Sequence, residues 1–300
     1  MHVKCIYIYN PNSGRQNNAK IESYVVEKLK TKYEIVDIKP TTKRGDAGVF
    51  AREACGKYDT IVISGGDGTV NEIINAIAPQ EQRPKIGYIP TGTTNDLAHS
   101  LKIPKKVKKA VDIILKGNST THDIFKVNDK YGIYVCAFGV FTGSSYTTSQ
   151  KSKKKFGKLA YYRYGIKEFF NTKNFNMTLK FDDVEISSKY ALGIIANSKY
   201  ISGYKINKMA SCNDGYVNVI LVKDKKKKGI SFKALFRIAK LFLFGVTKLK
   251  SSKNCQILKL NKFSVELPKN TIINLDGEKG FEGSFNFEVL NQHVEIFVKG

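Results

Sequence analysis

The first 125 residues alternate between runs of strand-forming residues and segments in which apolar residues recur at helical spacing. Such alternation is typical of βαβ units, in which parallel strands are joined by helices that cover the sheet. We therefore predict a mostly parallel, Rossmann-like α/β domain over residues 1–125. The predicted strands and helices, in chain order, are 3–9, 18–32, 33–38, 46–57, 60–64, 70–77, 85–90 and a helix within 93–101.

Beyond residue 125 the pattern changes to many short apolar runs that are separated by turn residues. Only the segments 158–170 and 230–249 have the apolar spacing of helices. Closely spaced short strands of this kind are typical of β-sandwiches and β-barrels. We therefore predict a second, β-rich domain over residues 126–300.

Polar, glycine-rich turns follow three of the predicted parallel strands. "NPNSGR" (10–15) follows the first strand, "GGDGTVNE" (65–72) the third and "PTGTTND" (90–96) the fourth. In open parallel sheets, ligands bind in the crevice beyond the carboxyl ends of the strands. We therefore expect these three turns to contribute to one binding site.

Asp67 is a lone carboxylate among the glycines of the second turn. The backbone amides of such a turn, together with the start of the following helix, make a site suited to phosphates. A carboxylate is unfavourable there unless a cation lies between it and the phosphate, so Asp67 is a candidate Mg²⁺ ligand, direct or through water. Asn71 and Glu72 could hold that arrangement from the first helical turn. The alternative is that Asp67 caps a helix in a tight turn.

The "PTGTTND" turn adds a second phosphate-type loop on the neighbouring strand. Gly92 permits close backbone approach, Thr93 offers a hydroxyl group and an amide, and Asp96 lies at the start of the next helix. Two such turns predict a nucleotide or polyphosphate rather than one isolated anion. The chain contains neither a Walker A loop nor a G-x-G-x-x-G fingerprint, which disfavours P-loop enzymes and NAD-dependent dehydrogenases.

The motifs "NPNSG", "GGDGTVNEIINAI" and "IPTGTTNDLAHSL", in that order, resemble the diacylglycerol-kinase catalytic domain of soluble lipid kinases. More narrowly, the chain resembles the soluble bacterial diacylglycerol kinases, with related segments at 159–169, 213–223 and 275–278. The resemblance implies an ATP-binding α/β domain, a β-sandwich domain and an active site in the cleft between them. It also implies an ATP- and Mg²⁺-dependent lipid kinase, with diacylglycerol as the first candidate substrate and phosphatidate as the product.

The resemblance also implies roles for individual residues. The catalytic residues would be Glu278 as general base and Asp67, Asp96 and Asp123, which would organise Mg²⁺ and its waters. Asp67 would bind that metal, and a second, structural metal would be held by Asp214 and the backbone carbonyls of Ser211 and Tyr216. The residues in contact with ATP would be Asn10, Pro11, Asn12, Ser13, Gly14, Thr42, Gly66, Asp67, Gly68, Thr69, Val70, Asn71, Glu72 and Thr93.

The chemistry of phosphoryl transfer supports Glu278 independently. The reaction requires in-line positioning, neutralisation of phosphate charge and an acceptor for the hydroxyl proton. Glycine turns and a metal meet the first two needs, and a carboxylate from the other domain could meet the third. Local alternatives remain: "LDGEKG" around Glu278 and "NDGY" around Asp214 are ordinary turn signals, and Asp123 could be a loop residue before a strand.

The chain carries 50 basic against 26 acidic residues, a net charge of +24. Such a charge favours polyanions, including an anionic membrane surface, although solvated lysines spread over the surface would give the same total. Lysines cluster at 151–158, and Lys233, Arg237 and Lys240 form a basic stripe beside an apolar face within 230–249. This stripe predicts a helix that lies on the membrane, or else one that is packed on the β-rich domain with its cations in water.

Several alternatives stay open. Other lipid acceptors include sphingoid bases, ceramide and phosphatidylglycerol, and the bulky Phe138 and Phe141 leave the acyl and headgroup preference undecided. NAD kinases and phosphofructokinases also use a Gly-Gly-Asp-Gly turn, but "VNEIIN" and "PTGTTND" favour the lipid branch. A catalytically weak lipid- or polyanion-binding protein is the third hypothesis. Nucleic acid is not an expected partner, because no known binding signature occurs.

The expected compartment is the cytoplasm, with transient contact at the inner face of the membrane. Five widely separated cysteines argue for a reducing environment. No signal peptide is recognisable, and no apolar run is long enough to span a membrane. Exposed strand edges are compatible with a homodimer.

Overall fold

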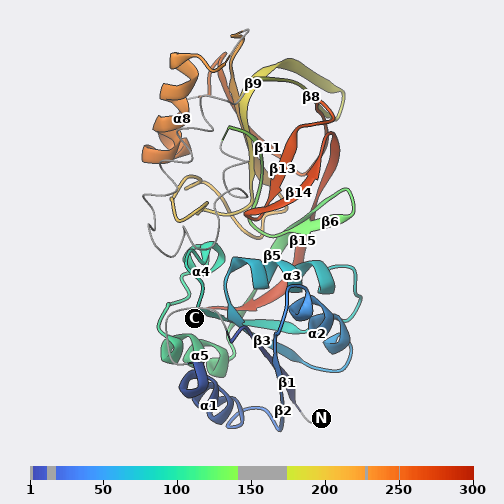
Figure 1. Ribbon diagram of the computed structural model, residues 1–300, viewed down its shortest axis with the longest axis vertical. Coiled ribbons are helices and arrows are strands. Elements are labelled where there is room, and N and C mark those ends of the chain that lie inside the picture. Colours follow the sequence, from blue (N-terminus) through green and yellow to red (C-terminus); the bar gives the residue numbers. More distant parts are fainter. Residues whose placement is uncertain (1–2, 12–17, 141–173, 227–228, 250) are drawn as a thin grey trace.

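The computed structural model describes residues 3–11, 18–140, 174–226, 229–249 and 251–300. Figure 1 shows an α/β part, drawn mainly in blue to green, below a β-rich part drawn mainly in yellow to red. Some predicted features lie outside the described residues: Asn12, Ser13, Gly14, Phe141, the lysine cluster at 151–158 and the helix at 158–170.

The α/β part confirms the predicted alternation. Its elements are β1 (Lys4–Tyr9), α1 (Asn18–Leu29), β2 (Ile35–Pro40), α2 (Asp46–Ala54), β3 (Thr60–Gly65), α3 (Asp67–Ile77), β4 (Lys85–Pro90), α4 (Asp96–Ser100) and α5 (Val107–Lys116). Helix α3 begins at Asp67, earlier than predicted, because the glycine turn itself forms the first helical turn. Helix α5 lies outside the predicted elements.

The strands of this part pair in the order β2-β1-β3-β4, and every pairing is parallel. All six residues of β3 are buried, as expected for a central strand that is covered on both faces. Helices α2 and α3 pack together on one side of the sheet and α1 and α5 on the other (Figure 1). The chain order reverses between β1 and β3, so the crevice for a ligand is expected at their carboxyl ends.

In the residues that the structure describes, the β-rich part consists of antiparallel strands, one helix and a short 3₁₀ turn. Its elements are β5 (Ser119–Val127), β6 (Lys130–Gly132), β7 (Val135–Gly139), β8 (Phe175–Phe181), β9 (Val184–Ala196), β10 (Val217–Lys223), α8 (Phe232–Phe244), the 3₁₀ turn η1 (Val246–Lys248), β11 (Cys255–Leu260), β12 (Lys262–Glu266), β13 (Ile272–Leu275), β14 (Glu278–Glu282) and β15 (Phe285–Phe297). Aromatic rings fill its core: Phe287 stacks on Phe125 at 5.0 Å and on Phe263 at 4.7 Å between centroids.

Strand β15 joins the two parts. It is one long strand, whereas the separate apolar runs at 285–290 and 293–298 predict two, and its register shifts between Leu290 and Val294. Its first half pairs with β12, and its end pairs in parallel with β4 through Ile296 and Ile86. The end of the chain therefore extends the α/β sheet, while the predicted domain boundary at residue 125 stays a prediction.

Candidate active site

The two glycine turns that follow β3 and β4 contact each other through their backbones. A Cβ atom added to Gly92 would lie 2.5 Å from the Cα of Gly66, and one added to Gly66 would lie 3.2 Å from the Cα of Gly92. A Cβ at Gly65 would collide with the side chain of Thr69 at 2.6 Å. These glycines therefore serve the packing of the turns, whereas the sequence suggested that the whole glycine cluster exists for the approach of a ligand.

Gly68 differs from these glycines because it is exposed in the first turn of α3. A Cβ atom there would meet only one atom within 4 Å, the Oε1 of Glu278 at 3.8 Å. Gly68 is therefore the residue of this turn whose backbone is open to a ligand.

Alanine substitutions should separate these two roles. We expect Gly92→Ala to lower the free energy of unfolding by about 1–3 kcal/mol, because its Cβ must displace the backbone of Gly66. Gly68→Ala should leave stability unchanged or raise it by roughly 0.5–1 kcal/mol, because alanine suits a helical position better than glycine. The kinase turnover of Gly68→Ala should fall instead. Urea unfolding and turnover measured on both variants check this, and equal destabilisation of the two would contradict it.

Asp67 connects the two turns. Its Oδ2 accepts a hydrogen bond from the backbone N–H of Asn95 at 2.7 Å, just before α4 begins. Burial raises the pKa of this carboxyl, and backbone N–H groups of Asn95, Asp96 and Leu97 oppose the shift. The predicted capping role is therefore present, but Asp67 caps α4 and not its own helix. Its Oδ1 is buried and, among the described residues, has no hydrogen-bond partner, which leaves one carboxylate oxygen suited to a cation or an ordered water.

Asn95 closes the second turn. It has a left-handed backbone (φ 56°), a conformation that asparagine tolerates well. Its Oδ1 accepts hydrogen bonds from the Gly92 N–H and the Tyr88 hydroxyl, both at 3.1 Å, and its Nδ2 donates to the Gly92 carbonyl at 2.7 Å. The turn that presents Thr93 to solvent is thus fixed by a buried asparagine.

Asp96 faces a loop of the β-rich part. Its two carboxylate oxygens accept hydrogen bonds from the backbone N–H groups of Ser202 (2.6 Å) and Gly203 (2.7 Å). Burial, reinforced by the negative charge of Asp67, raises the pKa of Asp96 to about 6, although these hydrogen bonds oppose the shift.

This raised pKa predicts a pH-dependent stability. The folded chain holds the Asp96 proton more tightly than the unfolded chain, so protonation of Asp96 stabilises the folded state. This stabilisation is fully present below pH 4 and is lost as the pH rises through about 6. Relative to Asp96→Asn, whose side chain stays neutral, the wild type should lose at most about 3 kcal/mol across this range. Urea unfolding of both proteins between pH 4.5 and 7.5 measures the difference, and parallel curves would contradict the prediction.

Asp123 lies at a different place in the fold. It is fully buried, and its carboxylate accepts hydrogen bonds from the backbone N–H groups of Gly215 (2.7 Å) and Gln292 (2.6 Å). In the part of the chain that the structure describes, no three His, Cys, Asp or Glu side chains gather into a metal cluster. Each of the three predicted aspartates is instead tied to backbone amides, and their joint role around Mg²⁺ stays a prediction.

Glu278 reaches the glycine turn from the β-rich part. It is the first residue of β14, its Oε1 lies over Gly68, and its Oε2 forms an ion pair with Arg44 at 3.3 Å. Arg44 belongs to the loop after β2, where the N–H and hydroxyl groups of Thr42 donate to Asp46 at 2.8 Å. The structure thus brings the predicted base, the loop of Thr42 and the Gly-Gly-Asp-Gly turn together.

Asp276, two residues before Glu278, is the buried link behind this arrangement. Its carboxylate accepts hydrogen bonds from three successive backbone N–H groups, those of residues 133–135, at 2.8–3.0 Å. It also accepts one from Asn71 of α3 at 3.1 Å. Burial raises its pKa to about 6. This carboxylate therefore clamps the turn that carries Glu278 to both parts of the chain.

The other predicted nucleotide contacts lie in the loops after β1 and β4 and in helix α3. The Asn10 N–H donates to the Ser64 carbonyl at 3.0 Å, which joins the ends of β1 and β3. Thr93 is exposed, Glu72 is half-buried and Val70 is buried in the core, where only its backbone could face a ligand.

At the predicted structural metal site, the ammonium group of a lysine lies beside Asp214. Asp214 Oδ2 pairs with Lys259 Nζ at 2.8 Å, and Asp214 Oδ1 accepts a hydrogen bond from the Tyr216 N–H at 3.2 Å. The same ammonium group lies 4.9 Å from the centre of the Tyr216 ring. Ser211 donates its hydroxyl proton to Asn213 Oδ1 at 2.9 Å. A metal at Asp214 would therefore compete with Lys259.

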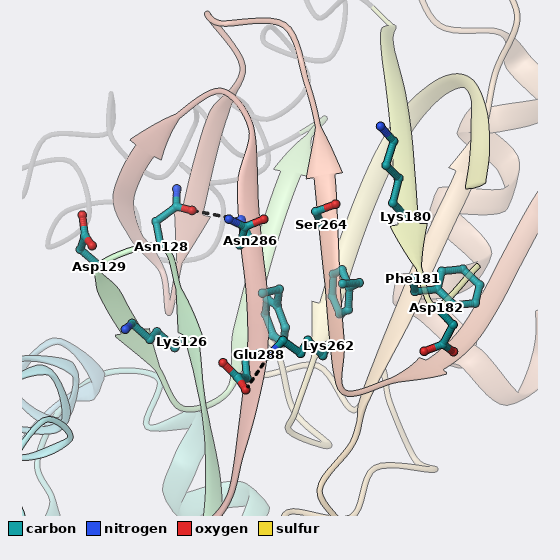
Figure 2. Close-up of a pocket in the computed structure, with 12 residues that line it drawn as sticks. Lys126, Asn128, Asp129, Lys180, Phe181, Asp182, Lys262, Ser264, Asn286 and Glu288 are labelled. Carbon is teal, nitrogen blue, oxygen red and sulfur yellow. Dashed lines mark hydrogen bonds and ion pairs between the residues drawn. The ribbon is translucent and has the colours of Figure 1, made fainter. Parts of the chain in front are cut away.

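A groove of about 680 Å³ lies on the outer face of β5, β15, β12 and β8, away from these residues (Figure 2). Two of its three lysines form ion pairs: Lys262 pairs with Glu288 at 3.2 Å and Lys180 with Glu266 at 2.6 Å. Its lining contains as many carboxylates as lysines and none of the predicted site residues, so we assign it no part in the candidate active site.

Comparison with known proteins agrees with this arrangement. The model of the diacylglycerol kinase catalytic domain matches residues 4–127, and that of the YegS C-terminal NAD kinase beta sandwich-like domain matches residues 139–298. A diacylglycerol kinase of Staphylococcus carnosus is 32% identical over 99% of this chain and 95% of its own length. This chain belongs to the diacylglycerol kinase family.

Other members support the assignment. A diacylglycerol kinase of Bacillus subtilis is 31% identical over 96% of this chain and 94% of its own length. A crystal structure of a diacylglycerol kinase from Bacillus anthracis has a TM-score of 0.82 and 25% identity, and covers 99% of this chain and 97% of its own. The predicted fold class and lipid-kinase branch are confirmed. No helix in the described part of this family member is long and apolar enough to cross a membrane.

In this diacylglycerol kinase family member, two residues that organise the site are not among the residues that the sequence predicts for it. Asn95 carried a usable signal, since asparagine after a glycine turn often adopts a left-handed backbone. Asp276 lies inside the quoted "LDGE" segment, but its burial depends on strands β6 and β7, which are distant in the sequence. Only the folded chain identifies it as a clamp.

Proposed function

We propose that this chain transfers the γ-phosphoryl group of ATP to the hydroxyl group of diacylglycerol and forms phosphatidate. The observation that carries the proposal is the position of Glu278, a carboxylate of the β-rich part that lies directly over the open Gly68 turn of the α/β part. The names of the relatives from Staphylococcus carnosus and Bacillus subtilis support diacylglycerol as the acceptor.

The residues around this turn fit a nucleotide and a metal. The exposed backbone at Gly68 and the N-terminus of α3 suit phosphate groups. Oδ1 of Asp67, which has no hydrogen-bond partner in the described part of the chain, is the oxygen we assign to Mg²⁺, direct or through water. When bound, Mg²⁺ would neutralise charge on the triphosphate. We assign ATP contacts to the loops after β1, β2, β3 and β4, which contain Asn10, Thr42, Gly68 and Thr93.

The side chains of the site supply the proton chemistry. Glu278 would accept the proton of the lipid hydroxyl as its oxygen attacks the γ-phosphorus, while the bond to the β,γ-bridging oxygen breaks and ADP leaves. The ion pair with Arg44 holds this carboxylate at the edge of the turn. The cleft between the two parts would hold the acceptor, and the cytoplasmic face of the membrane would supply it.

A radiolabelled ATP assay over a panel of lipids tests this function. We expect incorporation into diacylglycerol in mixed micelles, and loss of incorporation when EDTA removes Mg²⁺. Sphingosine, ceramide and phosphatidylglycerol serve as competing acceptors, and preferential labelling of any of them would replace diacylglycerol as the substrate. Absence of labelling on every lipid would overturn the kinase assignment in favour of a lipid-binding protein.

A further inference from the structure

Helix α8 buries one face against the β-rich part. Ala234, Ile238 and Leu241 are 0–1% exposed. Beside them Phe242 packs edge-on against Tyr204, with ring centroids 6.1 Å apart. The helix is thus held on the β-rich part by its inner face.

The opposite face of α8 is also apolar, but it is open to solvent. With about 100° of rotation per residue, Phe232, Phe236 and Leu243 project into one narrow sector, roughly opposite the buried residues. Their exposed fractions are 83%, 65% and 72%. A cluster of apolar side chains with this exposure is typical of a binding surface, whereas exposed apolar residues that occur singly are common on any soluble protein.

A cationic stripe runs along one flank of this outer face. Lys233, Arg237 and Lys240 are spaced by one helical turn, and α8 contains no acidic residue. Apolar and cationic stripes side by side match an anionic bilayer, whose phosphates attract the cations and whose acyl boundary accepts aromatic rings. A second copy of this chain fits less well, because α8 brings cations but no acidic residue to a two-fold contact between two such faces.

We propose that the outer face of α8 is a membrane anchor, in which Phe232, Phe236 and Leu243 enter the acyl boundary of an anionic bilayer. Lys233, Arg237 and Lys240 then bind its headgroups. This inference rests on the proposed function, since a bilayer is where a diacylglycerol kinase meets its lipid. It adds an apolar contribution to the electrostatic attraction that the charge alone suggests, so part of the binding should persist at high salt.

The anchor is connected to the candidate active site through one loop. The Val246 N–H, just beyond α8, donates to the Ile206 carbonyl at 2.7 Å, and Phe242 contacts Tyr204. The same loop donates the N–H groups of residues 202 and 203 to Asp96 at the start of α4. A docked α8 therefore lies one loop away from the turns that we assign to ATP.

A single tryptophan tests insertion directly, because the chain contains no tryptophan. We expect the emission of Phe236→Trp to shift to the blue with phosphatidylglycerol vesicles, and to be quenched when the lipid acyl chains are brominated. Val49→Trp, on the exposed surface of α2, is the matched control and should show neither change. Binding of Phe236→Trp to vesicles without shift or quenching would overturn the proposal. So would a blue shift that depends on protein concentration in the absence of lipid.

A second variant measures the contribution of the aromatic side chains. Phe232→Gln combined with Phe236→Gln should weaken vesicle binding roughly tenfold or more, and the residual affinity should become more sensitive to salt than that of the wild type. Val49→Gln should bind like the wild type, and unchanged vesicle binding of the double variant would overturn the anchor. Turnover of a water-soluble short-chain diacylglycerol should stay the same in all three proteins. Failure of the wild type on that substrate would count against the proposed function alone, since the tryptophan experiment needs no catalysis.

Discussion

Glu278→Gln is expected to lower kcat by about 10²–10⁴-fold, because the variant keeps the shape of the side chain but cannot accept the proton of the lipid hydroxyl. The side chain lies over Gly68 and pairs with Arg44 at the edge of the site, so its replacement leaves the core intact. The KM for ATP should change much less than kcat. Initial rates with mixed micelles of diacylglycerol, at saturating ATP, measure the effect.

The control for this prediction lies on the same strand. Glu282, at the far end of β14, is exposed and pairs only with Lys279 among the ion pairs described. Glu282→Gln should therefore retain wild-type turnover. If Glu278→Gln also kept its turnover, the proton would have to go elsewhere and the assignment of the base would be wrong.

Asp67→Asn is expected to reduce turnover about a hundredfold or more and to raise the Mg²⁺ concentration needed for half-maximal rate. The amide can still accept the hydrogen bond from the Asn95 N–H, but it removes the negative charge of the unpartnered oxygen. Rates measured across a Mg²⁺ titration check this. Unchanged Mg²⁺ dependence would contradict the metal assignment and leave Asp67 as a helix cap.

The same substitution should not weaken the fold. Because burial raises the pKa of Asp67, its ionised form is disfavoured in the folded chain, so a neutral amide should hold stability at pH 7 constant or increase it. Urea unfolding separates this outcome from simple misfolding. Asp112→Asn, on the exposed face of α5, is the control and should alter neither activity nor stability.

Local patterns predicted most of the fold. The continuous apolar runs at 60–64 and 85–90 became β3 and β4 nearly residue for residue, because buried parallel strands need no partner information to be recognised. The pairing of strands that are far apart in the sequence was harder to predict. The predicted pair of strands at the end of the chain is the single strand β15, and its parallel contact with β4 depends on residues more than 200 positions apart.

The candidate site divides in the same way. By itself, the sequence determined that glycine-rich turns follow parallel strands, because glycine position and apolar periodicity are local properties. Only the tertiary structure decided how the carboxylates are used: Asp67 caps α4, Asp96 holds the loop at 202–203, Asp276 clamps β6 and β7, and Glu278 alone lies over the open turn. The physical reason is that desolvation and backbone donors, which set the role of a buried carboxylate, come from strands and loops that only the fold brings together.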